Sequence, residues 1–113
     1  MAYENGGWVV TDAQINLAIA KIEYPDKKVG SLDDGSAYIF YNPTSGVRNY
    51  IKYWGDIGPI IEREKIDIRY SLRQETDWSA VSYDEHDSQV YEGVATTPTK
   101  AAALCYLKMK GLW

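Results

Sequence analysis

The 113-residue chain contains one cysteine and one histidine, and these scarcities exclude several kinds of site. A single cysteine, Cys105, rules out a disulfide within the chain and a thiolate metal cluster, and it fits a reducing compartment. The single histidine, His86, stands between Glu85 and Asp87 in a predicted loop and cannot serve both as a base and as a metal ligand. We therefore predict no catalytic residues, no metal site and no cofactor.

The sequence also lacks an excess of positive charge and any long apolar run. Twelve Lys and Arg residues stand against sixteen Asp and Glu residues, which gives a net charge of −4. Such a balance disfavours non-specific binding to nucleic acid, which requires many cations to neutralise phosphates. Because no stretch of about 18 apolar residues is present and the N-terminal residues carry no signal-peptide pattern, we expect a cytoplasmic protein that does not bind membranes.

Aromatic residues are abundant, but their types are unevenly used. Ten tyrosines and four tryptophans accompany a single phenylalanine, so most rings carry a polar atom that suits a surface exposed to both ligand and water. An apolar share of 45% and a charged share of 25% are typical of a folded globular domain. The length fits one domain, which we assign to residues 10–113 after an N-terminal lead-in at residues 1–9.

Capping signals predict the first and last helices. Thr11 and Gln14 have the spacing of a capping box, with Val10 and Ile15 as a hydrophobic staple, and Tyr24-Pro25 ends this helix. The last helix should begin after Thr97 with Pro98 at its first position and should end at Gly111.

The middle of the chain alternates strands with one more helix. Residues 29–53 have the turn signals of a hairpin or a three-stranded meander, and Asp56 is a candidate cap for a helix that runs to about Lys65, with Pro59 in its first turn. Strands follow at residues 66–73, 78–83 and 89–95. This order predicts an α+β domain, with an antiparallel sheet of about five strands and three helices packed on it.

Four segments together resemble the NinX-like family of small phage proteins of unknown function. The main one is Tyr50–Ile66 with Trp54, Asp56, Gly58, Pro59, Ile60, Ile61 and Glu62; the others are Thr11–Asn16, Trp78–Ala80 and Thr97–Ala102. They occur in the family's order and cover about residues 10 to 110. The resemblance implies a phage or prophage origin, and hence the host cytoplasm, with a non-essential accessory role and no known substrate.

A first candidate site lies at the start of the last helix. Helix N-termini present free N–H groups and a positive dipole end, and here the hydroxyls of Thr97 and Thr99 and the amine of Lys100 are added. The segment is not a Walker loop, because no second glycine precedes the lysine. Ordinary helix capping is the alternative interpretation.

A second candidate site lies around residues 48–54. Tyr50, Tyr53 and Trp54 alternate with the cations Arg48 and Lys52, which is the combination that a planar, phosphate-bearing ligand requires. The alternative is that Tyr53 and Trp54 are core anchors that fix the corner before the helix. We also assign Arg69 and Trp78, on two neighbouring predicted strands, to the ligand-binding set.

Three functional hypotheses follow. The first is a non-enzymatic binder that sequesters a nucleotide-type host immune signal and so acts against host defence. The second is a protein-interaction module for a host or phage replication or recombination factor. The third is a small hydrolase of nucleotide signals that uses the acids near His86. The expected partner is thus a nucleotide-like small molecule or a host protein, and exposed aromatics would also suit a homo-oligomeric interface.

Overall fold

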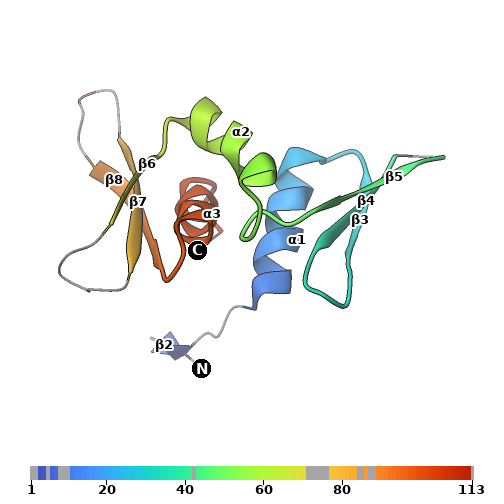
Figure 1. Ribbon diagram of the computed structural model, residues 1–113, viewed down its shortest axis with the longest axis horizontal. Helices are drawn as coiled ribbons and strands as arrows, with labels where there is room; N and C mark the ends of the chain where they lie inside the picture. The colour runs from blue at the N-terminus through green and yellow to red at the C-terminus, as the bar shows by residue number, and fades with distance from the viewer. Residues whose placement is uncertain are drawn as a thin grey trace.

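The computed structural model describes residues 3–4, 6–7, 11–41, 43–70, 77–83, 86 and 89–112. Within these residues, three helices lie between two three-stranded antiparallel sheets in a molecule that measures 46 × 34 × 22 Å (Figure 1). The elements follow the order β1 (Tyr3–Glu4), β2 (Gly6–Gly7), α1 (Asp12–Glu23), β3 (Lys28–Ser31), β4 (Ala37–Phe40), β5 (Ser45–Arg48), α2 (Trp54–Glu64), β6 (Asp67–Tyr70), β7 (Trp78–Tyr83), β8 (Gln89–Ala95) and α3 (Pro98–Met109).

Helix α1 and the β3-β4-β5 sheet form one end of the molecule. The predicted capping box is present, because Gln14 N donates to Thr11 Oγ1 at 3.2 Å and Thr11 N donates to Gln14 Oε1 at 2.9 Å. The proposed staple involves Val10, which lies outside the described residues. Ile15 and Ile19 of α1 are buried, and the helix packs on β3 and β4. The meander predicted within residues 29–53 is therefore the sheet that covers α1.

Helix α3 covers one face of the β6-β7-β8 sheet at the other end (Figure 1). Its contact with β8 is very close, since a Cβ atom built on Gly93 would lie 2.5 Å from the backbone nitrogen of Cys105. Ala80, which pairs with Gly93, is also fully buried, as are Ala101, Ala102 and Ala103. Small side chains on both elements therefore allow the helix backbone to approach the sheet.

The predicted fold class is confirmed: the protein is α+β, with three helices and antiparallel strands. Strands β3 to β8, however, are divided between two three-stranded sheets, and β1 pairs only with β2. After β5 the chain does not pair with β6; it makes a turn in which Lys52 N and Tyr53 N both donate to Asn49 O, at 3.2 and 3.0 Å, and then enters α2. Helix α2 thus separates the two sheets, and no hydrophobic periodicity could show this.

The start of α2 differs from the prediction. Tyr53 occupies the N-cap without a side-chain hydrogen bond, and the helix begins at Trp54, two residues before Asp56. Asp56 is not the cap of this helix. Its Oδ2 accepts a hydrogen bond from Asn49 N at 2.8 Å, so its carboxylate stabilises the turn that precedes the helix. As a result Pro59 lies inside the helix, not in its first turn, and the carbonyl of Gly55 lacks its usual partner there.

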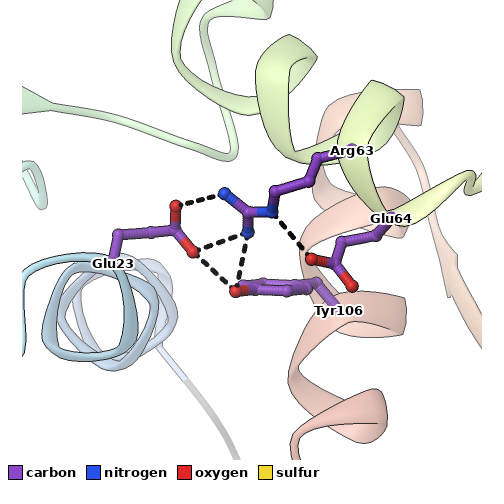
Figure 2. Close-up of polar contacts among 4 residues, drawn as sticks. All are labelled: Glu23, Arg63, Glu64 and Tyr106. Atoms are coloured by element: carbon purple, nitrogen blue, oxygen red, sulfur yellow. Dashed lines mark hydrogen bonds and ion pairs between the residues drawn. The ribbon is translucent and has the colours of Figure 1, made fainter.

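A polar cluster joins the three helices (Figure 2). The Arg63 guanidinium of α2 donates to both carboxylate oxygens of Glu23 at the end of α1, at 2.9 Å each, and its Nε donates to Glu64 at 2.7 Å. The hydroxyl of Tyr106 in α3 donates to Glu23 Oε2 at 2.5 Å and accepts from Arg63 Nη2 at 3.0 Å. One carboxylate therefore connects the half of the molecule built on α1 with the half built on α2 and α3.

The ionisation of this cluster follows from its contacts. Burial acts to raise the pKa of Glu23, but the hydrogen bonds from Arg63 and Tyr106 outweigh burial and lower this pKa. The pKa of Tyr106 is raised, first by burial and then by its hydrogen bond to Glu23. Near neutral pH the cluster thus contains an ionised carboxylate, a protonated phenol and a guanidinium, which is the state that satisfies each donor.

Candidate functional site

A polar cavity lies where the starts of α1 and α3 meet the turn after β5. We call it the two-helix pocket, and its volume is about 400 Å³. Its lining consists of Asp12, Asn16, Asp34, Asn49, Ile51, Lys52, Thr96, Thr97, Thr99 and Lys100. The residues predicted at the start of the last helix therefore do lie together at a pocket, although the sequence did not indicate that α1 forms its opposite wall.

Local hydrogen bonds fix the α3 side of this pocket. Thr97 is the N-cap, and its hydroxyl accepts from Lys100 N at 3.3 Å, as capping chemistry requires. The buried hydroxyl of Thr99 donates to the carbonyl of Ile51 at 2.5 Å and so attaches the turn after β5 to α3. Both hydroxyls hydrogen-bond to backbone groups of the chain, so these threonines shape the pocket wall. The positive charge of the pocket comes from Lys52 and Lys100.

The charges in the pocket are balanced. Lys100 Nζ lies 3.0 Å from Asp12 Oδ1, in a pair whose side chains are 33% and 57% exposed. Lys52 and Asp34 complete the charged groups of the lining. The backbone N–H of Ser36 donates to Asp34 at 2.9 Å and lowers the pKa of this carboxyl, so Asp34 is ionised at neutral pH. The pocket thus offers ammonium groups for an anion and carboxylates for hydroxyl or amino groups.

A buried amide network supports the pocket floor, and sequence reasoning missed it. Asn16 is fully buried; its Nδ2 donates to Gly35 O at 2.8 Å and to Asn49 Oδ1 at 3.0 Å, and its Oδ1 accepts from Tyr50 N at 2.8 Å. Asn49 in turn donates to Ser36 Oγ at 3.3 Å. The available signal was the helical position of Asn16, which lies on the same buried face as Ile15 and Ile19.

The aromatic residues of the second predicted site do not all share one environment. Tyr53 and Trp54 are 53% and 54% exposed at the start of α2, and Lys52 Nζ lies 5.3 Å from the centroid of the Tyr53 ring. Tyr50 is only 2% exposed and belongs to the hydrophobic core. Tyr53 and Trp54 are therefore surface rings and not the core anchors of the alternative interpretation, whereas the ring of Tyr50, which we assigned to the ligand-binding set, lies in the core.

The other predicted ligand residues lie elsewhere. Arg48 and Tyr50 line a separate cavity of about 260 Å³ between β5 and α2. Arg69 of β6 is paired with Asp67 at 3.1 Å and hydrogen-bonds Tyr83, and Trp78 of β7 packs edge-on against Tyr70 with ring centroids 5.3 Å apart. Neither Arg69 nor Trp78 lines the two-helix pocket, so the structure does not bring the whole predicted set together.

The described residues contain neither a cluster of metal ligands nor an exposed thiol. Among the described residues, no group of three or more His, Cys, Asp or Glu side chains could hold a metal ion. Cys105 is buried, and this burial raises the pKa of its thiol. The acidic neighbours of His86 lie outside the described residues. In the part of the chain that is described, no helix is both long and apolar enough to cross a membrane.

These features define a small α+β protein with a polar pocket between two helix starts. A family model described as Bacteriophage P22, NinX matches residues 7–110, so the chain belongs to this family of phage proteins, as the resemblance of its four segments indicated. No curated protein matches the chain. The family assignment makes it a small phage protein and carries no substrate or partner with it.

Proposed function

We propose that this protein is a non-enzymatic phage accessory protein that captures a nucleotide-type host immune signal in the two-helix pocket and so acts against host defence. The observation that supports it is the convergence of two helix starts and two lysines on one cavity of about 400 Å³. This volume falls within the range of about 300–1,000 Å³ that is usual for small-molecule sites.

The charged groups suit the parts of a nucleotide. Phosphate oxygens would be bound by Lys52 and Lys100 and attracted by the positive ends of α1 and α3. Asp12 and Asp34 would accept hydrogen bonds from ribose hydroxyls or from amino groups of the base, a role that acids fill in other nucleotide sites. An aromatic face is near, because Lys52 also contacts the exposed ring of Tyr53.

Binding of an anion would require Lys100 to leave Asp12. Both side chains are partly exposed, and such surface ion pairs contribute only about 0–1 kcal/mol. The exchange of one carboxylate for a phosphate at Lys100 is therefore energetically small. Asp12 would then be available for a hydroxyl group of the same ligand.

A thermal-shift panel tests this function. ADP-ribose, cyclic mononucleotides and cyclic dinucleotides are added separately, and a ligand at 100 times its Kd should stabilise the fold by about 2.7 kcal/mol. The protein is then denatured by heat and the released compound is identified by mass spectrometry. A shift with an intact compound supports capture, whereas a chemically altered compound or the absence of any shift contradicts it.

Matched variants locate the site. Lys52→Gln and Lys100→Gln should each weaken the stabilisation, because each removes a cation from the pocket. Lys28→Gln is the control, since Lys28 is an exposed lysine of β3 outside this lining. Equal effects of all three changes would indicate general electrostatics and not a site.

A second candidate function is favoured by a separate observation. Tyr53 and Trp54 expose more than half of their surface side by side at the start of α2, and exposed aromatic anchors are common at protein interfaces. A protein-interaction module for a host factor would use this surface. It predicts no thermal shift with any nucleotide and loss of the protein partner in Trp54→Ala.

A further inference from the structure

The hydroxyl of Tyr50 stands out among the buried polar groups. Tyr50 is 2% exposed, and its backbone N–H is bound by Asn16. Its phenolic hydroxyl makes no hydrogen bond to any residue within the described ranges. A buried hydroxyl without a partner costs about 1–3 kcal/mol, and such groups are rare in folded proteins. The Tyr50 hydroxyl therefore calls for a partner that the described residues do not supply.

The cavity of about 260 Å³ beside Tyr50 provides the place for such a partner. It is lined by Glu23, Tyr24, Arg48, Tyr50, Gly55, Asp56, Pro59 and Ile60. Burial raises the pKa of the Tyr50 hydroxyl. Besides Tyr24, the charged residues that influence this pKa are Arg48, Glu23 and Asp56, and all three line the cavity. Tyr50 and these three charged residues thus line the same cavity.

Two opposite charges in this cavity are also without an ionic partner. The Arg48 guanidinium is held by Val47 O at 3.0 Å and Tyr41 Oη at 3.3 Å, and within the residues described here it forms no ion pair. Asp56 uses Oδ2 for Asn49 N, and it too forms no ion pair with another described residue. Glu23 differs, because Arg63 and Tyr106 bind both of its oxygens.

From these three groups we infer a second binding site, distinct from the two-helix pocket, for a small zwitterion of the α-amino-acid class. A carboxylate would be bound by Arg48 and the hydroxyl of Tyr50, and an ammonium group would be bound by Asp56. The apolar surfaces of Pro59 and Ile60 would contact a short side chain. The cavity is smaller than the usual pocket for a drug-sized ligand, which matches a molecule of this size.

The site is independent of the proposed function. Arg48, Tyr50 and Asp56 are absent from the lining of the two-helix pocket, and Lys52, Thr97 and Lys100 are absent from the lining of this cavity. Asn49 connects the two sites, because it lines the two-helix pocket and its backbone N–H donates to Asp56. One site can therefore be removed by substitution while the other is retained.

The test uses the full chain labelled with ¹⁵N and each of the standard L-amino acids as probes at about 10 mM, which detects a Kd near 1 mM or about 4 kcal/mol of binding free energy. We expect saturable shifts of the backbone amides of Tyr50, Gly55 and Asp56 with at least one amino acid. The N-acetyl and the carboxamide derivatives of that amino acid lack one charge each and should bind at least about tenfold more weakly.

Variants separate binding from folding. Tyr50→Phe keeps the ring and removes only the unpartnered hydroxyl, so its melting temperature should be unchanged or higher while affinity falls by about tenfold. Arg48→Gln should likewise lose affinity. The controls Arg69→Gln and Lys100→Gln, outside this cavity, should bind as the unchanged chain does.

Three results would overturn the inference. The first is that no amino acid shifts these amides saturably. The second is that the blocked derivatives bind as tightly as the zwitterion. The third is that Tyr50→Phe and Arg48→Gln retain full affinity.

Discussion

Gly93 of β8 lies directly under Ala101 of α3, so close that a Cβ atom on Gly93 would overlap the carbonyl oxygen of Ala101. The same atom would be 2.5 Å from Cys105 N and 3.0 Å from Leu104 Cβ. Most of these neighbours are helix backbone and cannot move as a flexible side chain could. The close contact of α3 with its sheet, and with it the position of Thr97 and Lys100, depends on the absence of a side chain at residue 93.

Gly93→Ala should therefore destabilise the protein. Overpacking of this kind costs about 1–3 kcal/mol or more, because α3 must move away from β8. Chemical denaturation measures the change. Gly30→Ala is the control, since Gly30 is also a strand glycine but a Cβ atom placed on it would have no neighbour within 4 Å; this change should be neutral or slightly stabilising. Equal stability of the two variants would contradict the packing described here.

The Glu23 cluster should make stability depend on pH in a defined window. Because the pKa of Glu23 is lowered in the folded state, its contribution is present above its ordinary value of 4.5 and is lost as the pH falls below it. Glu23→Gln should cost about 1 kcal/mol at neutral pH, since Arg63 is half exposed. The free energy of unfolding of both proteins, measured from pH 7 to pH 3, should converge toward the acid end.

The control for this experiment is an exposed ion pair. Asp67 and Arg69 have side chains that are each 53% exposed, so Asp67→Asn should change stability by less than about 0.5 kcal/mol. A difference between wild type and Glu23→Gln that stays constant down to pH 3 would contradict the assigned role of Glu23.

The amide network should be a major source of stability for the half of the molecule built on α1. Asn16→Ala removes the partner of Tyr50 N and of Asn49 Oδ1 and leaves Gly35 O without its donor. The expected cost is about 3 kcal/mol, because several buried polar groups lose their partners together. Gln14→Ala on the exposed side of α1 breaks only the capping box and should cost about 1 kcal/mol. Similar losses in urea denaturation would argue against the network.

Trp54 should be dispensable for folding. Its ring is 54% exposed, so Trp54→Ala should alter stability by less than about 0.5 kcal/mol. Thermal denaturation checks this, with Ile57→Ala as the contrast, since Ile57 is fully buried in the same helix and should cost about 2–5 kcal/mol. A large loss with Trp54→Ala would show that this ring is a core anchor after all.

Local signals predicted the elements of the fold well, and long-range contacts account for what they missed. Three helix boundaries depend only on neighbouring residues and are confirmed. They are the cap at Thr11, the start of α3 at Pro98, and Gly111 just after the end of α3, where the φ of this glycine is +76°. The strands at residues 78–83 and 89–95 also have the predicted bounds. The start of α2 was wrong because Asp56 satisfies the backbone of Asn49 instead of its own helix.

The candidate site could be predicted only in part for the same reason. Thr97 and Lys100 were identifiable as the start of a helix, but Asp12 and Asn49 reach the same pocket from distant parts of the chain. Nothing in the sequence near Tyr50 distinguishes its buried ring from the exposed rings of Tyr53 and Trp54. The contact that distinguishes Tyr50 comes from Asn16, 34 residues earlier, whose Oδ1 accepts from the backbone N–H of Tyr50.

The most direct test of the proposed function is the binding isotherm of the nucleotide that stabilises the chain most in the thermal-shift panel, measured by titration calorimetry on the unchanged chain and on Lys100→Gln at equal ionic strength. Capture in the two-helix pocket predicts saturable binding that Lys100→Gln weakens by about tenfold or more, the effect of one lost charge-assisted hydrogen bond. The absence of heat at any concentration of the nucleotide, or identical isotherms for the two proteins, would contradict it.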